Sequence, residues 1–563
     1  MEKRTILAFA LSFIILILWS VLYAPQGGRT PAPDETPRQA EERRPRVEPA
    51  SPEGAPQIQT DPADSPPAAE QIIPDLPPPQ IIEREIRVET PLYSAVWSND
   101  KGMIQSFKLK HYRETAKEDS PLVDLVNLDP GHDGLLGFYF AFEGAERAHP
   151  VLYEFSDDSI RVTPGSGAKT LVMTGRSPDG VVMEHSYRFH PDRYLIDVET
   201  RIVNRGQTPL EGAVAARLKN LPPEDRQSYY GFLGIALLLN GELNEIKPKK
   251  MRDEDMRLSG DIGWMAYEDD YFMVSVVPET SDEGRFRGRQ LSSGALEAHY
   301  LTPNVRLGYQ EQVSADFSLY LGPRDLSILG TLGKDLEKAV SFGWTDIIAK
   351  PLLHALRFFN RYVHNYGFSI IILTVLIKIL FWPLTHKSYK SMKEMQKIQP
   401  IMAKIRTKYK DNKEQMNREM MQLYKTYKVN PLGGCLPMVI QIPVFFALFR
   451  TLGSSIELRH TPFILWINDL SSPDRLFNFP FEIPFMAPPS GIPVLTLLMG
   501  ASMFLQQKMS PAPGDPTQAK VMMFLPLIFT FVFINFPSGL VLYWLTNNIL
   551  SIGQQYRILK KPG

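Results

Sequence analysis

One cation interrupts the most apolar stretch in the C-terminal half of the chain. Residues Gly367–Leu384 read GFSIIILTVLIKILFWPL, and Lys378 is their one charged side chain. Placing a lysine at the centre of a membrane helix costs about 2.5–3.5 kcal/mol on insertion scales. Charges in such segments usually face a bundle interior or a wet cavity and serve a function there. Lys378 is therefore a candidate site for attracting an acidic group in a low-dielectric environment.

Two interpretations of Lys378 are open. Its stem could extend to the near membrane interface, which would leave the helix face apolar. The next polar residue, Thr385, lies roughly 10 Å further along a helix, which is further than the stem easily reaches. In the other interpretation, Lys378 faces an internal, water-filled groove. Thr374 lies four residues earlier on the same helical face, so the pattern favours a polar stripe within a bundle.

Catalytic and nucleotide-binding motifs are absent from the sequence. There is no HExxH, CxxC or GxSxG pattern, and Gly330–Asp335 lacks the spacing and the Ser/Thr of a phosphate-binding loop. The ten histidines form no ligand pattern, and the single cysteine, Cys435, cannot form an internal disulfide. The formal net charge of −1 gives no general attraction to nucleic acid. We expect no enzyme, no cofactor, no metal and no direct nucleic-acid recognition.

The first 80 residues predict an anchor and a tether. An apolar run, Ile6–Tyr23, follows two basic residues, which place the N-terminus in the cytoplasm by the positive-inside rule. The run is long enough to span a membrane, and bulky Leu22 at the −3 position disfavours a cleaved signal peptide. Residues 25–80 hold fifteen of the 48 prolines and cannot bury enough apolar surface to fold. We expect a transmembrane anchor over 1–24 and a disordered linker over 25–80.

Short alternating runs separated by turn signals begin near residue 81. In the clearest run, Tyr194–Ile202, inward-facing side chains alternate with charged ones, as in a half-buried antiparallel strand. We expect a large all-β sandwich over 81–340. Its aromatic clusters, Tyr229–Tyr230 and Tyr267–Phe272, either contact a ligand or belong to the core and the sheet edges.

The remaining part of the chain predicts membrane helices. Residues 350–366 have apolar side chains at helical spacing and basic residues on other faces, which is typical of an interfacial amphipathic helix or of a packed soluble helix. Five apolar spans within a core over 367–563, together with the N-terminal anchor, make a multi-pass α-helical protein with six transmembrane helices. After Gly367–Leu384, the spans are Gly433–Phe449, Gly491–Gln506, Val521–Phe536 and Ser538–Tyr556. Basic residues in the short loops place both termini in the cytoplasm, with the β domain outside.

A basic loop over 386–432 predicts a helical hairpin between the first two of these core spans. Twelve basic residues face four acidic ones, which indicates a cytoplasmic position. Methionines recur at helical spacing on both arms, so we expect the arms to meet along a methionine-rich seam. Such a surface suits adaptable contacts with partners. The candidate contact residues are Met395, Met402, Met416, Met420, Lys404 and Lys408.

Several motifs together resemble the YidC family of bacterial membrane protein insertases. They are Lys378 in its apolar run, the basic hairpin, the segments Val429–Cys435, Gln441–Pro443 and Phe536–Leu540, and the pair Leu542-Tyr543. The resemblance covers essentially the whole chain. The proline-rich linker and the large β domain are similar to the Gram-negative form of the family.

The resemblance implies a β-supersandwich outside the membrane and five core helices around a hydrophilic groove open to cytoplasm and lipid. The expected groove residues are Lys378, Thr374, Gln441, Tyr543, Trp544, Thr546 and Asn547. The groove cation of the family is usually arginine, so Lys378 keeps the charge but loses the planar fork of donors. Trp544 stands where the family often has a tyrosine.

The resemblance also implies an insertase and chaperone for newly made integral membrane proteins, acting alone or with the Sec translocon. The expected partners at the bacterial inner membrane are nascent membrane proteins, the ribosome, the Sec translocon with its accessory subunits, and membrane lipids. A solute transporter with a periplasmic binding domain is the alternative, although no inverted repeat or intramembrane charge pair supports it. A membrane-tethered carbohydrate-active enzyme would leave the extra helices and the basic hairpin unexplained.

Overall fold

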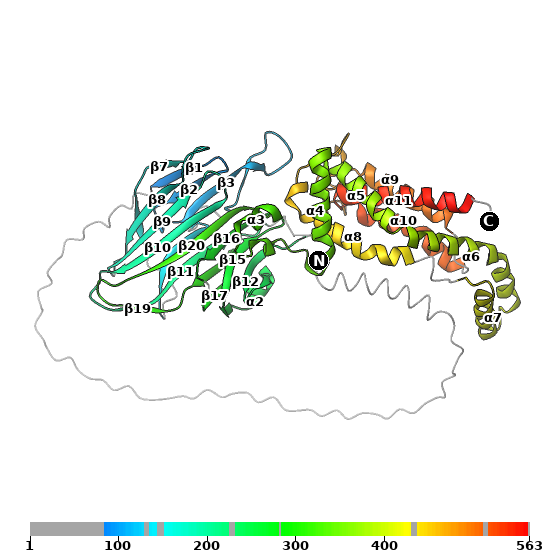
Figure 1. Cartoon of the computed structure of the whole chain (residues 1–563), viewed down its shortest axis with the longest axis horizontal. Helices are drawn as coiled ribbons and strands as arrows, with labels where there is room; N and C mark the ends of the chain where they lie inside the picture. Colours follow the sequence, from blue (N-terminus) through cyan, green and yellow to red (C-terminus); the bar gives the residue numbers. More distant parts are fainter. Residues whose placement is uncertain are drawn as a thin grey trace, which may run out of the picture.

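The computed structural model of the chain describes residues 84–128, 134–143, 151–178, 180–223, 231–280, 283–429, 436–510 and 516–560. The expected anchor (1–24), the linker (25–80) and Tyr229–Tyr230 lie outside the described residues. Figure 1 shows a β-rich part at one end of the molecule and a helical part at the other. We call the β-rich part, from Glu85 to Pro323, the β domain.

The β domain is built from strands that belong to three sheets. In chain order they are β1 (Glu85–Glu89), β2 (Tyr93–Ser98), β3 (Ile104–Arg113), β4 (Leu122–Asp124), β5 (Leu136–Phe142), β6 (Leu152–Phe155), β7 (Ser159–Arg161), β8 (Lys169–Arg176), β9 (Val181–Phe189), β10 (Leu195–Asn204), β11 (Leu210–Asn220), β12 (Gly234–Leu239), β13 (Glu242–Ile246), β14 (Met256–Gly260), β15 (Ile262–Glu268), β16 (Phe272–Pro278), β17 (Gly284–Gln290), β18 (Leu296–Leu301), β19 (Val305–Leu307) and β20 (Gln312–Pro323). One helix, α2 (Pro248–Asp253), interrupts them.

A nine-stranded sheet is the common layer of the β domain. Its strand order is β13-β12-β15-β16-β20-β10-β9-β8-β6. A five-stranded sheet has the order β4-β3-β2-β1-β7, and a six-stranded sheet has the order β14-β17-β18-β11-β19, with β5 also paired to β11. Neighbouring strands are antiparallel except for β1 and β7. This mostly β architecture confirms the predicted class of the domain.

Strand β10 shows how the sequence sets the register of the large sheet. Ile196, Val198 and Ile202 are buried, and the charged residues between them are more exposed. Ile196 lies opposite Phe189 of β9 on one side and Leu319 of β20 on the other. A slip by one residue would turn the charged face into the core, so the alternation fixes the pairing. The predicted half-buried strand is confirmed.

The hydrophobic core lies between the large sheet and the two smaller ones. The ring of Trp97 on β2 lies edge-on to Phe189 of β9, with centroids 5.4 Å apart. On the other smaller sheet, Phe138 of β5 lies 4.9 Å from Phe317 of β20. All four rings are buried. Fully burying a large apolar side chain contributes about 1.5–3 kcal/mol, so such pairs hold the layers together.

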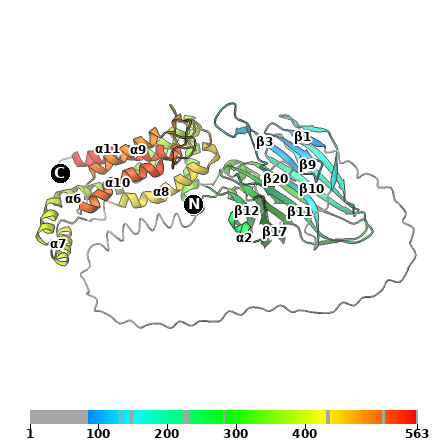
Figure 2. The same ribbon diagram turned by 180° about the vertical axis from the view of Figure 1, so that it is seen from behind.

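The helical part follows three short connecting elements: α3 (Leu326–Leu332) and the 3-10 turns η1 (Leu336–Ala339) and η2 (Gly343–Thr345). Its helices are α4 (Asp346–Val363), α5 (Tyr366–Leu380), α6 (Trp382–Lys408), α7 (Lys413–Thr426), α8 (Leu436–Ser454), α9 (Val494–Met509), α10 (Pro516–Phe533) and α11 (Ser538–Lys560). A turn, η4 (Ile456–Leu458), and two short strands, β21 (Leu476–Asn478) and β22 (Gly491–Ile492), lie between α8 and α9. In Figures 1 and 2, α4 crosses the bundle at the end facing the β domain, and α7 lies at the far end.

The first expected core span, Gly367–Leu384, is not one straight helix. Helix α5 ends at Leu380, Phe381 leaves helical geometry, and α6 starts at Trp382. Pro383 explains the break, because proline has no backbone N–H and its ring clashes with the carbonyl group four residues earlier. Among the described residues, no single helix is both long and apolar enough to cross a membrane. Helices α5 and α6, bent by 65° at the break, together have the length and composition to do so, and Val439–Ser454 and Met522–Phe533 are shorter apolar helices.

Candidate functional site

Lys378 lies inside the helical part, on the side of α5 that meets α11. Its side chain is 9% exposed, and its Nζ donates to Ser551 Oγ at 2.5 Å and to Asn547 Oδ1 at 3.4 Å. Both partners are neutral, and no carboxylate in the described part of the chain forms an ion pair with this nitrogen. A buried ammonium without a counter-ion bears a desolvation cost. A negatively charged group placed next to Lys378 would therefore offset part of this desolvation cost.

Polar contacts between α6 and α11 continue in line with Lys378. The Gln554 side-chain amide donates to Thr385 Oγ1 at 3.0 Å, and both residues are buried. Positions 547, 551 and 554 are spaced by four and three residues, so they lie on one face of α11. We name Lys378, Thr385, Asn547, Ser551 and Gln554 the polar seam.

The sequence analysis missed three members of the polar seam: Thr385, Ser551 and Gln554. Their spacing on α11 was a usable signal, because small and amide side chains recur on one face after Asn547. On another face of α11, Asn548 donates to Ser502 Oγ of α9 at 2.9 Å. Interhelical hydrogen bonds of this kind contribute on the order of 1 kcal/mol in membrane proteins. The helix that carries the polar seam is thus held in orientation by α9.

Three other predicted groove residues, Thr374, Gln441 and Tyr543, make contacts separate from the polar seam. Thr374 is 1% exposed and donates to the carbonyl oxygen of Ile370 within its own helix at 2.6 Å. Gln441 on α8 donates through Nε2 to the hydroxyl of Tyr543 on α11. The fold brings Gln441 and Tyr543 together although 102 positions separate them in the sequence. Tyr543 lies about one helical turn before Asn547 on α11. Thr374 and Tyr543 therefore face the packed interior.

Trp544 lies in a different environment from the polar seam. Its ring lies edge-on to Phe445 of α8 at 5.0 Å and is 5.3 Å from Phe533 of α10. Edge-to-face pairs at these distances are worth about 0.5–1.5 kcal/mol each beyond area burial. Trp544 thus joins three helices through aromatic packing. Thr546, two residues later, is half-buried.

The predicted hairpin residues divide between a packed cluster and an exposed surface. Met395, Met402, Met416 and Met420 belong to the apolar cluster between α6 and α7. Lys404 and Lys408 are exposed. Met421, which the sequence analysis did not single out, is 57% exposed. The predicted methionines hold the two arms together, while the lysines and Met421 are available to partners.

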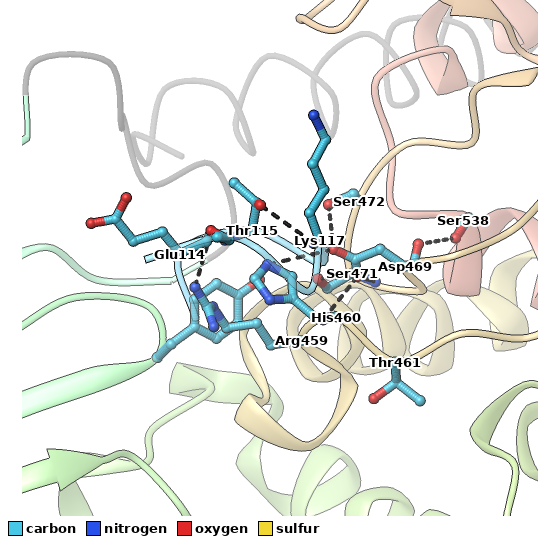
Figure 3. A network of polar contacts seen from close by, with 12 residues as sticks. Glu114, Thr115, Lys117, Arg459, His460, Thr461, Asp469, Ser471, Ser472 and Ser538 are labelled. Carbon is cyan, nitrogen blue, oxygen red and sulfur yellow. Dashed lines mark hydrogen bonds and ion pairs between the residues drawn. The ribbon is translucent and has the colours of Figure 1, made fainter. Parts of the chain in front are cut away.

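A polar network joins the β domain to the helical part (Figure 3). Arg459, after α8, donates to the carbonyl oxygen of Glu114 at 3.2 Å, and its guanidinium lies over the rings of Tyr271 and Phe272 at 5.5 and 5.3 Å. The Tyr271 hydroxyl donates to the carbonyl oxygen of Gly453 at 3.1 Å. Arginine over aromatic faces contributes about 0.5–1 kcal/mol at exposed sites. The aromatic cluster Tyr267–Phe272 therefore supplies both core and junction residues.

The same network reaches the first residue of α11. Asp469 accepts hydrogen bonds from the backbone N–H of His460 and from the N–H and hydroxyl of Ser471, at 2.7–3.1 Å. Its carbonyl oxygen accepts from Ser538 Oγ at 2.7 Å, as Figure 3 shows. Ser538 begins the helix that carries Asn547 and Ser551. The loop after α8 thus fixes the end of α11 opposite the hairpin.

Buried ionisable groups of the β domain have shifted pKa values with clear causes. Burial raises the pKa of Glu268 to about 7, with Glu245 and Asp269 adding to the increase and Arg324 opposing it. Glu268 and Arg324 are almost fully buried, with Oε2 and Nη2 3.3 Å apart. Burial lowers the pKa of His185 to about 3, so this histidine is a neutral core residue. No group of three or more His, Cys, Asp or Glu residues in the described ranges could hold a metal ion.

Comparisons with known proteins agree with both parts of this architecture. The family model described as YidC periplasmic domain matches residues 85–355, and that described as 60Kd inner membrane protein matches residues 358–562. The chain is 41% identical to the membrane protein insertase YidC of Pelobacter propionicus, over 100% of this chain and 99% of that protein. The insertases YidC of Syntrophus aciditrophicus and Geobacter metallireducens are 40% and 41% identical, with 100% of this chain covered.

These matches define an inner membrane protein with a periplasmic β domain, and the chain belongs to the YidC family. Among solved structures, a crystal structure of an active YidC insertase with its first transmembrane domain resolved covers 83% of this chain and 91% of that chain. Its sequence identity is 18% and its TM-score is 0.37. A galactose mutarotase related enzyme from Lactobacillus acidophilus covers 42% of this chain and 97% of its own, at 10% identity and a TM-score of 0.28.

Proposed function

We propose that this chain inserts newly made membrane proteins into the bacterial inner membrane and assists their folding. Its relatives from Pelobacter propionicus and Syntrophus aciditrophicus are named membrane protein insertases. The observation that carries the proposal at the level of residues is the polar seam. It holds a buried ammonium group, bonded to neutral acceptors, beside the large apolar cluster of the helical part. An acidic or polar segment of a nascent chain would replace these neutral partners. The Coulomb attraction of Lys378 for a carboxylate grows as the dielectric constant falls.

The proposed mechanism uses the seam for positioning and the lipid for the driving force. The polar end of the substrate enters between α5 and α11 and contacts Lys378, Asn547 and Ser551 there. Its apolar segment then partitions into lipid beside the bundle. Each buried methylene group contributes about 0.8 kcal/mol, so a spanning segment offsets the transient cost of its polar end. An acidic end gains further from the membrane potential as it crosses.

The proposal includes a membrane topology with six spans and both termini in the cytoplasm. The described helices α5, α8, α9, α10 and α11 would be the five core spans, and the β domain would lie in the periplasm. Helices of 15 or 16 residues, such as α5 and α9, cover about 24 Å at 1.5 Å per residue. Because a bilayer has about 30 Å of hydrocarbon, we propose that the protein thins the membrane around itself.

The α6–α7 hairpin is the proposed docking element for cytoplasmic partners. Its exposed lysines include Lys404 and Lys408, and it lies at the end of the molecule away from the β domain (Figure 1). A ribosome that delivers a nascent chain has a negatively charged surface, which these lysines complement. The Sec translocon and its accessory subunits are further proposed partners. No observation on the described residues favours a solute transporter.

Site-specific photocrosslinking during translation tests the proposal. A photoreactive amino acid is placed at Thr546, which is half-buried beside the polar seam. A matched control carries it at Tyr309, which is 61% exposed on the β domain. Nascent chains of a small membrane protein should crosslink at position 546 and not at 309, in vesicles containing the full-length protein. Equal crosslinking at both positions, or none at 546 while insertion proceeds, would contradict the proposed route.

A further inference from the structure

Three bulky apolar residues project from the segment between α8 and α9. Leu465, Phe477 and Phe485 are 80%, 69% and 82% exposed. Each also has a positive φ, of 56°, 57° and 68°. The left-handed conformation is unfavourable for bulky residues and persists only where the surrounding structure imposes it, commonly at functional sites. The segment therefore bears two costs at once: backbone strain and the exposure of large apolar side chains.

A set of hydrogen bonds centred on Arg475 holds the part of this segment that contains Phe485. Its guanidinium donates to the carbonyl oxygens of Pro489 at 3.0 Å and Ile534 at 2.9 Å, and to Asn535 Oδ1 at 3.3 Å. Asn535 in turn donates through Nδ2 to the carbonyl oxygen of Phe485 at 2.8 Å. Residues 476–492, which we call the aromatic loop, are thus fixed to the end of α10. Two half-buried polar side chains, Arg475 and Asn535, thus hold the backbone of the loop at Phe485.

The aromatic loop continues an apolar face of α10. Phe524, Ile528 and Phe531 are 62%, 56% and 56% exposed and recur at helical spacing on one side of that helix. The ring of Phe485 lies 6.0 Å from the ring of Phe531. Phe481, 60% exposed, stacks on Phe479 with centroids 5.3 Å apart. The exposed apolar surface of the helix therefore extends past its last turn onto the loop.

The two charged residues that directly precede the aromatic loop are engaged in hydrogen bonds. Asp474 is buried and accepts from the N–H of Leu495 at 2.7 Å and the hydroxyl of Thr496 at 3.0 Å. The guanidinium group of Arg475 donates to the carbonyl oxygens of Pro489 and Ile534. Within residues 476–492, Glu482 is the one charged side chain, and it is exposed. A surface with several rings, a single charge and continuity with a helix face has the character of an interfacial membrane element, where aromatic residues sit at headgroup level.

We infer that the aromatic loop inserts Phe477, Phe481 and Phe485 into the lipid leaflet at the C-terminal end of α10. The occupant of this surface is phospholipid, at the boundary between headgroups and acyl chains. The inference rests on the proposed function in one respect, since it takes α10 to be a membrane span. A protein partner would be expected to present charges or a groove complementary to the loop. Because the loop continues the exposed apolar face of α10, both surfaces are expected to contact the same apolar solvent, which is lipid. The loop then anchors the periplasmic end of α9 and α10 at a fixed depth.

Nitroxide accessibility in vesicles tests this inference. Full-length protein in which Cys435→Ser removes the natural thiol carries a single spin label through Phe477→Cys, Phe485→Cys, Ile528→Cys or Tyr309→Cys. The protein is placed in phosphatidylethanolamine–phosphatidylglycerol vesicles, and relaxation by oxygen and by a water-soluble nickel complex is measured. Labels at 477 and 485 should resemble the label at 528, with high oxygen and low nickel accessibility. The label at 309 should show the reverse.

The outcomes separate this inference from the proposed function. Nickel accessibility at 477 and 485 equal to that at 309, with 528 in lipid, would overturn the loop inference alone. Nickel accessibility at 528 as well would overturn the membrane placement of α10 on which it rests. Labels at 477 and 485 that become protected only when another protein is added would assign the surface to a protein partner instead. If the cysteine variants fold poorly, Phe477→Trp and Phe485→Trp allow the same test, because brominated lipids should quench added tryptophan emission at both positions.

Discussion

The ammonium group of Lys378 on α5 donates to the hydroxyl of Ser551 on α11, although 173 positions separate the two residues. Ser551 also donates to the carbonyl oxygen of Asn547 at 2.7 Å, so one turn of α11 supplies both acceptors for the lysine. A neutral hydroxyl stabilises an ammonium group less than a carboxylate does. The lysine is thereby held in position while its charge remains available.

Replacing the buried charge should affect substrates with acidic ends most strongly. Lys378→Ala removes a charge-assisted contact worth about 1.5–3 kcal/mol, so insertion of an acidic-tailed substrate should fall roughly tenfold or more. Lys378→Arg keeps the charge and should insert such a substrate at near the normal rate. A substrate with an uncharged tail serves as the control. Protease protection of the translocated tail measures insertion, and equal protection with all three proteins would remove Lys378 from the mechanism.

Close packing between α9 and α10 depends on Gly500. A Cβ at this position would lie 2.1 Å from Thr530 Oγ1 and 3.1 Å from Thr530 Cβ, so Gly500→Ala forces the two helices apart. Overpacking of this kind typically costs about 1–3 kcal/mol. Gly553→Ala in α11 is the matched control, because nothing lies within 4 Å of its Cβ and alanine favours a helix by roughly 1 kcal/mol. The midpoint of thermal unfolding in detergent should be at or above that of the natural protein for Gly553→Ala, and below it for Gly500→Ala.

The stability of the β domain should fall as pH rises through the range set by Glu268. The pKa of this carboxyl is raised from 4.5 to about 7 in the folded protein. The folded state therefore holds the proton more tightly than the unfolded state. The contribution of protonated Glu268 to the free energy of unfolding is complete below about pH 4.5. This contribution, up to about 3 kcal/mol, is lost as the pH rises through about 7.

Glu268→Gln should remove that part of the pH dependence. Pulse proteolysis in urea, applied to the full-length protein between pH 4.5 and pH 8, gives the free energy of unfolding of the β domain. The slope with pH is the quantity to compare, because the variant also leaves Arg324 without its buried partner. Glu297→Gln is the control and should leave the slope above about pH 5 unchanged, because Glu297 titrates below this range in both the folded and the unfolded state. Its pKa is lowered to about 2, since hydrogen bonding and charge from His299, and the charge of Arg217, outweigh its burial. An unchanged slope in Glu268→Gln would assign the effect to other groups.

The junction between the β domain and the helices should loosen when Arg459 is shortened. Arg459→Ala removes one hydrogen bond and two contacts with aromatic rings, worth together about 1–3 kcal/mol. Arg459→Lys keeps the charge but not the planar stacking and should be intermediate. Arg306→Ala, at a highly exposed arginine of the β domain, is the control. The distribution of distances between spin labels on the β domain and on α8 should broaden most in Arg459→Ala, less in Arg459→Lys and not in Arg306→Ala. An unchanged distribution in Arg459→Ala would show that the junction is held by other contacts.

The local sequence was sufficient to predict a strand or helix wherever the spacing of apolar side chains along the chain determines that element. The alternation in β10 predicted which residues face the core, because a strand turns successive side chains to opposite faces. The apolar runs of the C-terminal part predicted the regions that became α5 and α8–α11, and the spacing of methionines predicted which side chains meet between α6 and α7. The helix break at Phe381 was also encoded locally, by Pro383, but the analysis took the apolar run as continuous.

Contacts between distant segments were decided by the tertiary structure. The sequence by itself determined that a cation lies within an apolar run, because composition and period are local properties. Only the fold selected Ser551 and Asn547 as its partners and placed Trp544 among phenylalanine rings, because helix rotation depends on how all neighbouring helices pack. Likewise, the carbonyl group of Phe485 is held by Asn535, which itself accepts from Arg475, and these residues meet only in the folded chain.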